Sequence, residues 1–251
     1  MLKKIALATA LFAGLGHAYA YQAEVGLSYD LVDFDHGGTG NTFGVDGTYY
    51  FNPVQIKNNP LNEADFLDRA SNVQLNATYT NGDPTDVTTV SGQGELFIPN
   101  SDFYLSAGVG YQNWDTPVRD VDQVNYKAEV GYLPAPGLLV AAGILGYDND
   151  YDDDIDATLR AKYVTNLAGY DMNFEANTSF GNVDYYGVAA DLYLDKTLSV
   201  GLGYNSDYDR VSDDVINVRA KKFFTQNISL EGGIAFGDDD TTYGLRGGYR
   251  F

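Results

Sequence analysis

The chain of 251 residues carries 35 acidic against 15 basic side chains, a formal net charge of −20, and no cysteine. This acidity argues against a nucleic-acid partner, because phosphates need basic contacts, and the absence of cysteine excludes disulfide bonds. The 21 Tyr and 13 Phe argue against a disordered chain. A barrel in which only alternate residues face lipid would suit this mixture of polar and aromatic residues.

The first twenty residues have the organisation of a secretory signal peptide. Lys3 and Lys4 precede a short apolar run, and Ala18-Tyr19-Ala20 supplies the small residues expected at a cleavage site. The run is too short for a membrane-spanning helix, and no later segment approaches the roughly 20 apolar residues that such a helix needs. We therefore predict an exported chain with a signal peptide at 1–20 and one domain at 21–251.

Segments in which apolar and polar residues alternate follow one another through the rest of the chain. A period of two is typical of a strand with one apolar and one polar face. A segment of about ten residues, tilted by roughly 40°, climbs about 25 Å, which matches the apolar band of an outer-membrane barrel. We predict an all-β fold, a transmembrane antiparallel up-and-down β-barrel of about 14 strands. The predicted strands are 22–33, 41–52, 72–81, 86–98, 103–113, 122–134, 137–147, 154–164, 170–181, 184–194, 197–206, 214–224, 227–237 and 241–251.

The connections alternate between short turns and mostly longer, acidic loops, as expected where turns face the periplasm and loops face outward. One connection on the turn side, over 52–72, is long. Asn59-Pro60 can cap and begin a helix, and Leu61, Ala64 and Leu67 share one helical face. We predict a short periplasmic helix near 60–70, either gating the mouth of the barrel or lying on its surface within a linker.

Two features depart from simple alternation. The segment from Leu138 to Ile144 is apolar on both faces, and Lys222 falls on the face that should contact lipid. A lysine can occupy such a position if its long side chain reaches the polar boundary of the membrane, or if a bulge shifts the register.

The last predicted strand places Tyr243, Leu245, Tyr249 and Phe251 on one face. A strand that finishes on a carboxyl-terminal Phe resembles the assembly signal of outer-membrane barrels. We therefore expect Phe251 to be recognised by the barrel-assembly machinery, and the barrel to contact outer-membrane lipid and lipopolysaccharide.

Three parts of the chain also resemble one protein family. They are the segment YQAEV at 21–25, the segment PLNEADFLDRASN at 60–72, and the ending Tyr249-Arg250-Phe251. The chain resembles the porin family of Acinetobacter-type outer membranes. The resemblance implies a channel for water and small solutes in the outer membrane of a Gram-negative bacterium.

If apolar residues face lipid, charged residues of the opposite parity face the lumen. The acids come from early and late strands alike, whereas the basic residues come only from later strands. We predict a water-filled pore in which an acidic wall faces a basic wall. Such opposed charges would orient dipolar and zwitterionic solutes and leave mild ion selectivity. The alternative is a closed lumen in which buried charges pair as salt bridges. The predicted pore-lining residues are Glu24, Asp46, Glu95, Lys127, Glu129, Arg160, Lys162, Glu175, Arg219, Lys221, Glu231, Arg246 and Arg250, and Asp30 and Asp191 share their parity.

Passive diffusion of small polar or charged solutes through a narrow charged lumen is the leading functional hypothesis. The main alternative is a non-conducting structural or adhesive barrel whose acidic loops are its working surface; a secreted soluble β-sandwich fits the sequence less well. The acidic runs at 148–154 and 238–240 could attract cations or bridge lipopolysaccharide, or could simply be solvated. We predict no catalytic, cofactor or metal site, because the exported part contains a single histidine, His36, and no nucleophile lies near it in the sequence.

Overall fold

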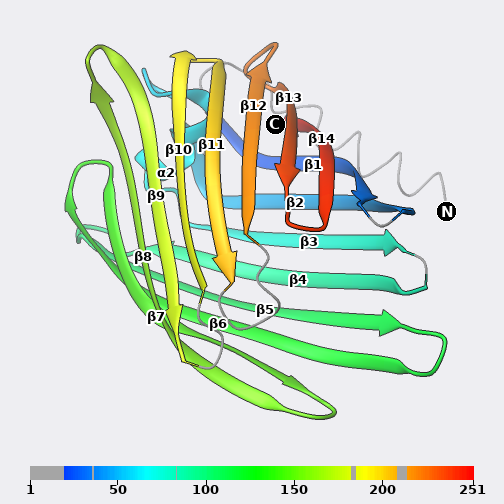
Figure 1. Ribbon diagram of the computed structural model, residues 1–251. Helices are drawn as coiled ribbons and strands as arrows, with labels where there is room; N and C mark the ends of the chain where they lie inside the picture. The colour runs from blue at the N-terminus through cyan, green and yellow to red at the C-terminus, as the bar shows by residue number, and fades with distance from the viewer. Residues whose placement is uncertain (1–19, 36, 83, 182–184, 208–213) are drawn as a thin grey trace, which may run out of the picture.

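Fourteen antiparallel strands close into one barrel (Figure 1). The computed structural model describes residues 20–35, 37–82, 84–181, 185–207 and 214–251. Most of the predicted signal peptide, at residues 1–19, and His36 lie outside the described residues. The strands are β1 (Ala20–Phe34), β2 (Thr39–Gln55), β3 (Asn72–Asn81), β4 (Asp86–Phe97), β5 (Phe103–Asp115), β6 (Asp120–Ala135), β7 (Leu138–Asn149), β8 (Asp153–Leu167), β9 (Tyr170–Phe180), β10 (Tyr185–Asp195), β11 (Leu198–Asp207), β12 (Val215–Phe223), β13 (Ile228–Phe236) and β14 (Asp240–Arg250).

Each strand pairs with its neighbours in sequence, and β1 pairs with β14 from Glu24 opposite Arg250 to Phe34 opposite Asp240. The first and last strands, blue and red in Figure 1, therefore lie side by side and leave no free edge. The predicted up-and-down barrel and its fourteen strands are confirmed. We call the end that carries Ala20 and Arg250 the turn end, and the opposite end the loop end.

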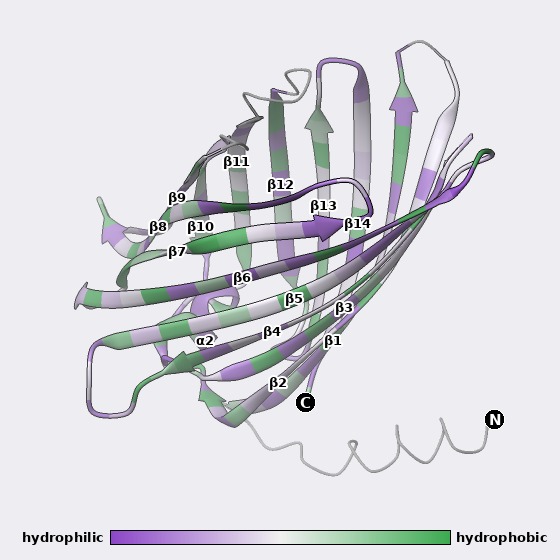
Figure 2. Ribbon diagram, turned by 90° about the horizontal axis from the view of Figure 1, so that it is seen from below, coloured by the Kyte–Doolittle hydropathy of each residue, from purple (hydrophilic) through white to green (hydrophobic). Residues whose placement is uncertain are grey.

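The alternation predicted from the sequence is visible as bands of colour along the strands (Figure 2). On β3, Leu75 is 65% exposed on the outer surface, whereas Asn76 on the opposite face is partly covered. Strand after strand exposes Leu, Val, Ile, Phe and Tyr in this way. A continuous apolar belt of this extent suits contact with lipid rather than with water. Among the described residues, no helix is long and apolar enough to cross a membrane.

Both departures from alternation have a structural explanation. The inward residues Leu139 and Ala141 of β7 are almost fully buried, and Leu139 packs in a cluster with Phe97, Tyr104 and Leu133. Lys222 reaches the turn between β10 and β11, where its Nζ donates to Thr197 Oγ1 at 2.6 Å. Both ladders of β12 run without a register shift, so the lysine reaches the boundary without a bulge.

The predicted helix is present but shorter than expected. A 3-10 turn, η1 (Leu61–Glu63), leads into α2 (Ala64–Leu67), and Arg69 then adopts a left-handed backbone conformation with φ of 52°. A positive φ at a residue with a side chain marks a turn, which ends the helix early. Asn59 was expected to cap the helix, but no side-chain cap hydrogen bond is formed, and Pro60 holds an extended ψ of 134°.

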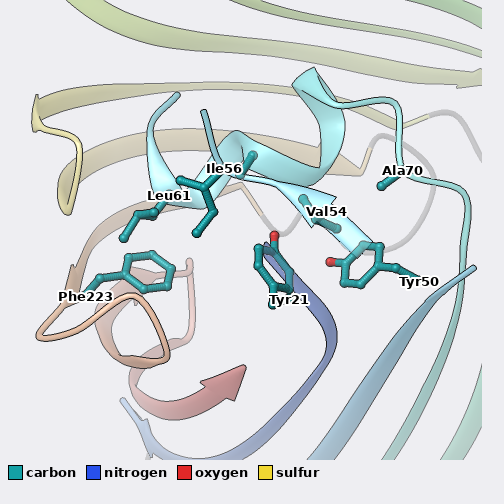
Figure 3. Packing of buried hydrophobic residues seen from close by; sticks show 8 residues of the cluster. Tyr21, Tyr50, Val54, Ile56, Leu61, Ala70 and Phe223 are labelled. Carbon is teal, nitrogen blue, oxygen red and sulfur yellow. The ribbon is translucent and has the colours of Figure 1, made fainter. Parts of the chain in front are cut away.

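The hydrophobic core of the barrel lies at its turn end rather than at its middle. Tyr21, Tyr50, Val54, Leu61 and Phe223 are buried together there (Figure 3). The ladder between β1 and β2 is irregular between Tyr21 and Ala23, and beyond it the Tyr21 ring packs edge-on against Tyr50 at 5.4 Å. Burying these rings on the polar side of the strands gives the connection between β2 and β3 an apolar surface to pack on.

The two faces of β3 should respond oppositely to a charge. Leu75→Arg should lower the free energy of unfolding in lipid vesicles by about 2–4 kcal/mol, because it places a guanidinium in hydrocarbon. The matched variant Asn76→Arg, one residue along but facing the lumen, should change it by less than about 1 kcal/mol. Equal losses, measured by urea unfolding, would contradict the assigned faces.

Candidate functional site

Eleven of the thirteen predicted pore-lining residues form ion pairs inside the barrel. The pairs join Glu24 to Arg246 and Arg250, Asp46 to Arg246, Glu129 to Arg160, Glu175 to Lys162, and Glu231 to Lys221, while Arg219 pairs with Asp191. Glu95 and Lys127 have no ionic partner within 4.0 Å among the described residues. The charges therefore form neighbouring pairs rather than an acidic wall that faces a separate basic wall.

One group of charges joins the two ends of the chain. Arg246 on β14 donates through Nε to Asp46 Oδ1 on β2 at 2.8 Å, and through Nη2 to Glu24 Oε1 on β1 at 3.1 Å. Arg250 donates to the second oxygen of Glu24 at 2.5 Å. Charge-assisted hydrogen bonds of this kind are among the strongest in proteins. They tie β14 to the first two strands from inside the lumen.

Arg250 also contacts residues 56–71, which form the connection between β2 and β3 and contain η1 and α2. We call this connection the plug. Arg250 Nη1 donates to the carbonyl of Leu61 at 2.7 Å, and the amide of Leu61 donates to the carbonyl of Lys196 in the turn between β10 and β11 at 2.8 Å. Further along, Arg69 pairs with Asp102 in the turn between β4 and β5 at 2.9 Å. The plug thus contacts widely separated parts of the rim at the turn end.

The most deeply buried charge of the plug is Glu63, which is 2% exposed. Its carboxylate lies 2.8 Å from Lys162 Nζ on β8, and it accepts a hydrogen bond from the Tyr193 hydroxyl on β10. Burial raises the pKa of the Glu63 carboxyl above its ordinary value, against the opposing influence of Lys162 and Tyr193. Lys162 also contacts Glu175 at 2.9 Å and lies 5.1 Å from the centre of the Phe66 ring. One lysine therefore joins the plug to the barrel wall.

Sequence reasoning missed Glu63 and Tyr193 as members of this site. Both lie within the segments that were recognised, Glu63 in the predicted helix and Tyr193 in a predicted strand. The parity of Tyr193 placed it on the inner face, which is a usable signal. Glu63 carried no such signal, because its partner Lys162 lies far away in the sequence.

Two bidentate pairs lie further inside the lumen. The guanidinium of Arg160 on β8 contacts Glu129 on β6 at 2.7–3.2 Å, and Arg219 on β12 donates to both oxygens of Asp191 on β10 at 2.8 Å. Ser106 adds a hydrogen bond to Glu129 at 3.0 Å. These carboxylates are satisfied by the chain itself.

Open space remains between the plug and the wall. A cavity of about 340 Å³ is lined by Glu63 and Phe66 of the plug and by wall residues that include Glu95 and Arg219. A second cavity of about 270 Å³ shares Glu95 and Arg160 with the first and continues along β4 and β6. The lining is rich in charged and amide side chains. Within the described ranges, no group of three or more His, Cys, Asp or Glu residues is arranged to hold a metal ion.

The barrel is similar to known bacterial proteins. A family model described as "Putative general bacterial porin" matches residues 1–149. The crystal structure of the Acinetobacter baumannii outer membrane protein Omp33 is 28% identical, with a TM-score of 0.73, over 94% of this chain and 100% of that one. The CymD monoaromatic hydrocarbon channel has a TM-score of 0.61 at 7% identity, over 92% of this chain and 89% of that one, and so shares the fold alone. No curated protein matches the chain.

The contact between Glu63 and Lys162 should hold the plug in place. Because the chain has no cysteine, the variant Ala64→Cys gives one thiol at a residue that is 0% exposed. Adding Lys162→Met should speed maleimide labelling of that thiol at least about tenfold, since removing one partner of a buried pair costs about 3–5 kcal/mol.

The control is the double change Lys162→Met with Glu63→Gln in the same Ala64→Cys background. It removes both charges and should restore most of the protection from labelling. If the single and double changes label at the same rate, the ion pair does not hold the plug.

Proposed function

The chain belongs to the general bacterial porin family, and we propose that it is an outer-membrane porin through which water and small polar or charged solutes diffuse passively. Family membership supports an outer-membrane channel. The polar lumen supports the finer proposal about the solutes, because apolar solutes would gain nothing from a lining of paired charges.

The observation that carries the proposal is the chain of adjoining cavities inside the barrel. The cavity above the plug shares Glu95 and Arg160 with the one along β4 and β6, and shares Arg219 and Glu231 with a third, of about 300 Å³, between β12 and β14. Spaces of this size exceed the share of liquid volume occupied by several water molecules, at about 30 Å³ each. A lumen filled by its own side chains would have no such spaces.

We further propose that the plug controls passage at the periplasmic mouth. Its contacts with the turns after β4 and β10, and with β8 and β14, span the turn end. A solute that travels along the lumen meets the plug before the periplasm. Of the two roles considered for this segment, a gate at the mouth or a linker on the surface, these contacts favour the gate.

The ion-paired interior also favours one alternative, a non-conducting barrel whose role is structural or adhesive. In that case the salt bridges and the plug would close the lumen permanently, and the acidic loops would be the working surface. Measurement of ion conductance separates the two proposals, because only the porin conducts when reconstituted.

In planar bilayers, the full exported chain should conduct weakly in KCl. Replacing residues 57–69 by a short Gly-Ser turn should raise single-channel conductance several-fold, because the obstruction at the turn end is removed. Since that deletion also removes part of the core, the point variant Glu63→Ala provides a second measurement and should raise the frequency of open events. Absence of conductance in all three proteins would overturn the porin proposal.

The arginines of the lumen should influence ion selectivity. The double variant Arg219→Gln and Arg246→Gln leaves Asp191 and Asp46 without their guanidinium partners. Its reversal potential in a KCl gradient should shift toward that of K⁺, with a permeability ratio raised at least about twofold. Lys222→Gln, at a lysine on the outer surface of β12 that contacts Thr197 at the turn end, is the control and should leave the potential unchanged. An unchanged potential in the double variant would place both arginines away from the conduction path.

A further inference from the structure

Glu95 and Lys127 are lumen charges of opposite sign that line one cavity, and neither has an ionic partner among the described residues. Within the part of the chain that the structure describes, Glu95 on β4 accepts hydrogen bonds from three neutral groups and from no cation. They are the Tyr104 hydroxyl at 2.7 Å, the Asn72 amide at 3.1 Å and the Gln93 amide at 3.2 Å. Lys127 on β6 is exposed and makes no hydrogen bond or ion pair with any other residue that the structure describes. Most other lumen charges are paired, so this pair of exceptions stands out.

The two charges face the same cavity without contacting each other. The cavity of about 270 Å³ is lined by Glu95 and Lys127 together with Gln93, Glu129 and Tyr185. Glu129 is the next inward residue on the same strand, two positions beyond Lys127, but its carboxylate contacts Arg160 and Ser106. The ammonium of Lys127 is thereby left available.

The register of the strands fixes the distance between Glu95 and Lys127. Gln93 lies opposite Gly108, and Gly108 lies opposite Lys127, in a row across β4, β5 and β6. Glu95 lies two residues further along β4, in the next inward row. Two strand spacings of about 4.8 Å and two residues of about 3.4 Å put the Cα atoms of Glu95 and Lys127 roughly 12 Å apart.

A glycine gives Lys127 its direction. A side chain at Gly108 would begin 3.2 Å from Lys127 Cε and 3.4 Å from Gln93 Cβ, so the lysine lies across the space that the glycine leaves empty. The ammonium group is thus directed from β6 toward β4. On that strand Gln93 separates it from Glu95, because the Gln93 amide donates to the carboxylate.

We propose that Glu95 and Lys127 form a binding site for a zwitterionic solute of the amino-acid class. The ammonium group of the solute would contact Glu95, and its carboxylate would contact Lys127. A solute with both charges satisfies the two groups at once, whereas a singly charged solute leaves one of them unpaired. The buried rings of Phe97 and Tyr104 beside Glu95 reduce the screening of this interaction by water. The role of the site in transport rests on the proposed porin function, but the binding itself does not.

The test is equilibrium dialysis of the detergent-solubilised, full exported chain against radiolabelled γ-aminobutyrate. Butyrate and butylammonium serve as size-matched probes that carry one charge each. Glu95→Gln and Lys127→Met should each weaken binding of γ-aminobutyrate about tenfold, the effect of losing one charge-assisted contact. Butylammonium should respond to Glu95→Gln alone, and butyrate to Lys127→Met alone.

Asp30→Asn is the matched control. Asp30 is a second carboxylate without an ion pair among the described residues, and it lines the different cavity between β12 and β14. The change should leave γ-aminobutyrate binding unaltered. If Glu95→Gln folds poorly, Glu95→Asp retains the charge and shortens the side chain, and it should weaken binding less than Lys127→Met does.

The proposal is overturned if the unmodified chain does not bind γ-aminobutyrate, or if neither Glu95→Gln nor Lys127→Met weakens its binding. KCl conductance, measured on the same proteins, tests the porin function separately. Conductance without zwitterion binding would overturn only the proposed binding site. Binding without conductance would support the proposed site and overturn the proposed porin function.

Discussion

The pairing of β1 with β14 is the constraint on which the rest of the structure depends. Lipid offers no hydrogen bonds to a backbone, so every amide and carbonyl of a spanning strand must pair within the protein. Only a closed ladder meets this requirement, and the register from Glu24 opposite Arg250 to Phe34 opposite Asp240 closes it. Arg246 and Arg250 strengthen the same closure from the lumen by bonding to Glu24 and Asp46. The side chains that give the lumen its charge therefore also hold its last strand in place.

Closure imposes a fixed cost on the interior. A strand that shows lipid an apolar face must turn every second residue inward, and charges there lose much of their hydration. Ion pairs offset this loss by reaching across one intervening strand, as Arg160 on β8 with Glu129 on β6 and Arg219 on β12 with Asp191 on β10 illustrate. The basic residues of the lumen lie in the second half of the chain, yet closure of the barrel brings Arg246 beside the acids of the first strands. Neighbouring pairs, rather than two facing walls, are the outcome.

The strands could be predicted because their parity is a local property. The alternation alone assigns Leu75 and Asn76 to opposite faces of β3. It also identifies Lys222 as an exception, a lysine on the lipid-facing side whose side chain must reach the polar boundary of the membrane. The attachment of the plug could not be predicted in this way. Glu63 meets Lys162 and Tyr193, and Leu61 meets Arg250 and Lys196, only because the barrel has closed around them. Contacts between positions so far apart produce no periodic pattern in the sequence, so they cannot be predicted from it. The helix itself was expected, but its early end at Leu67 depends on the left-handed conformation of Arg69, which the residue types there do not favour.

The plug and the barrel are stabilised by different interactions, and this separation allows one to move without the other. The barrel is held by its ladder of backbone hydrogen bonds, none of which passes through α2. The plug is held by the packing of Leu61 and Ala64 at the turn end and by a few polar contacts, chiefly those of Glu63 and Arg250. Local opening with a free energy well below that of global unfolding is characteristic of such segments. Under the proposed gating role, an equilibrium of the plug would set how far the lumen is open. Substitutions on the wall would then act on this equilibrium only where they contact the plug, as Lys162 does.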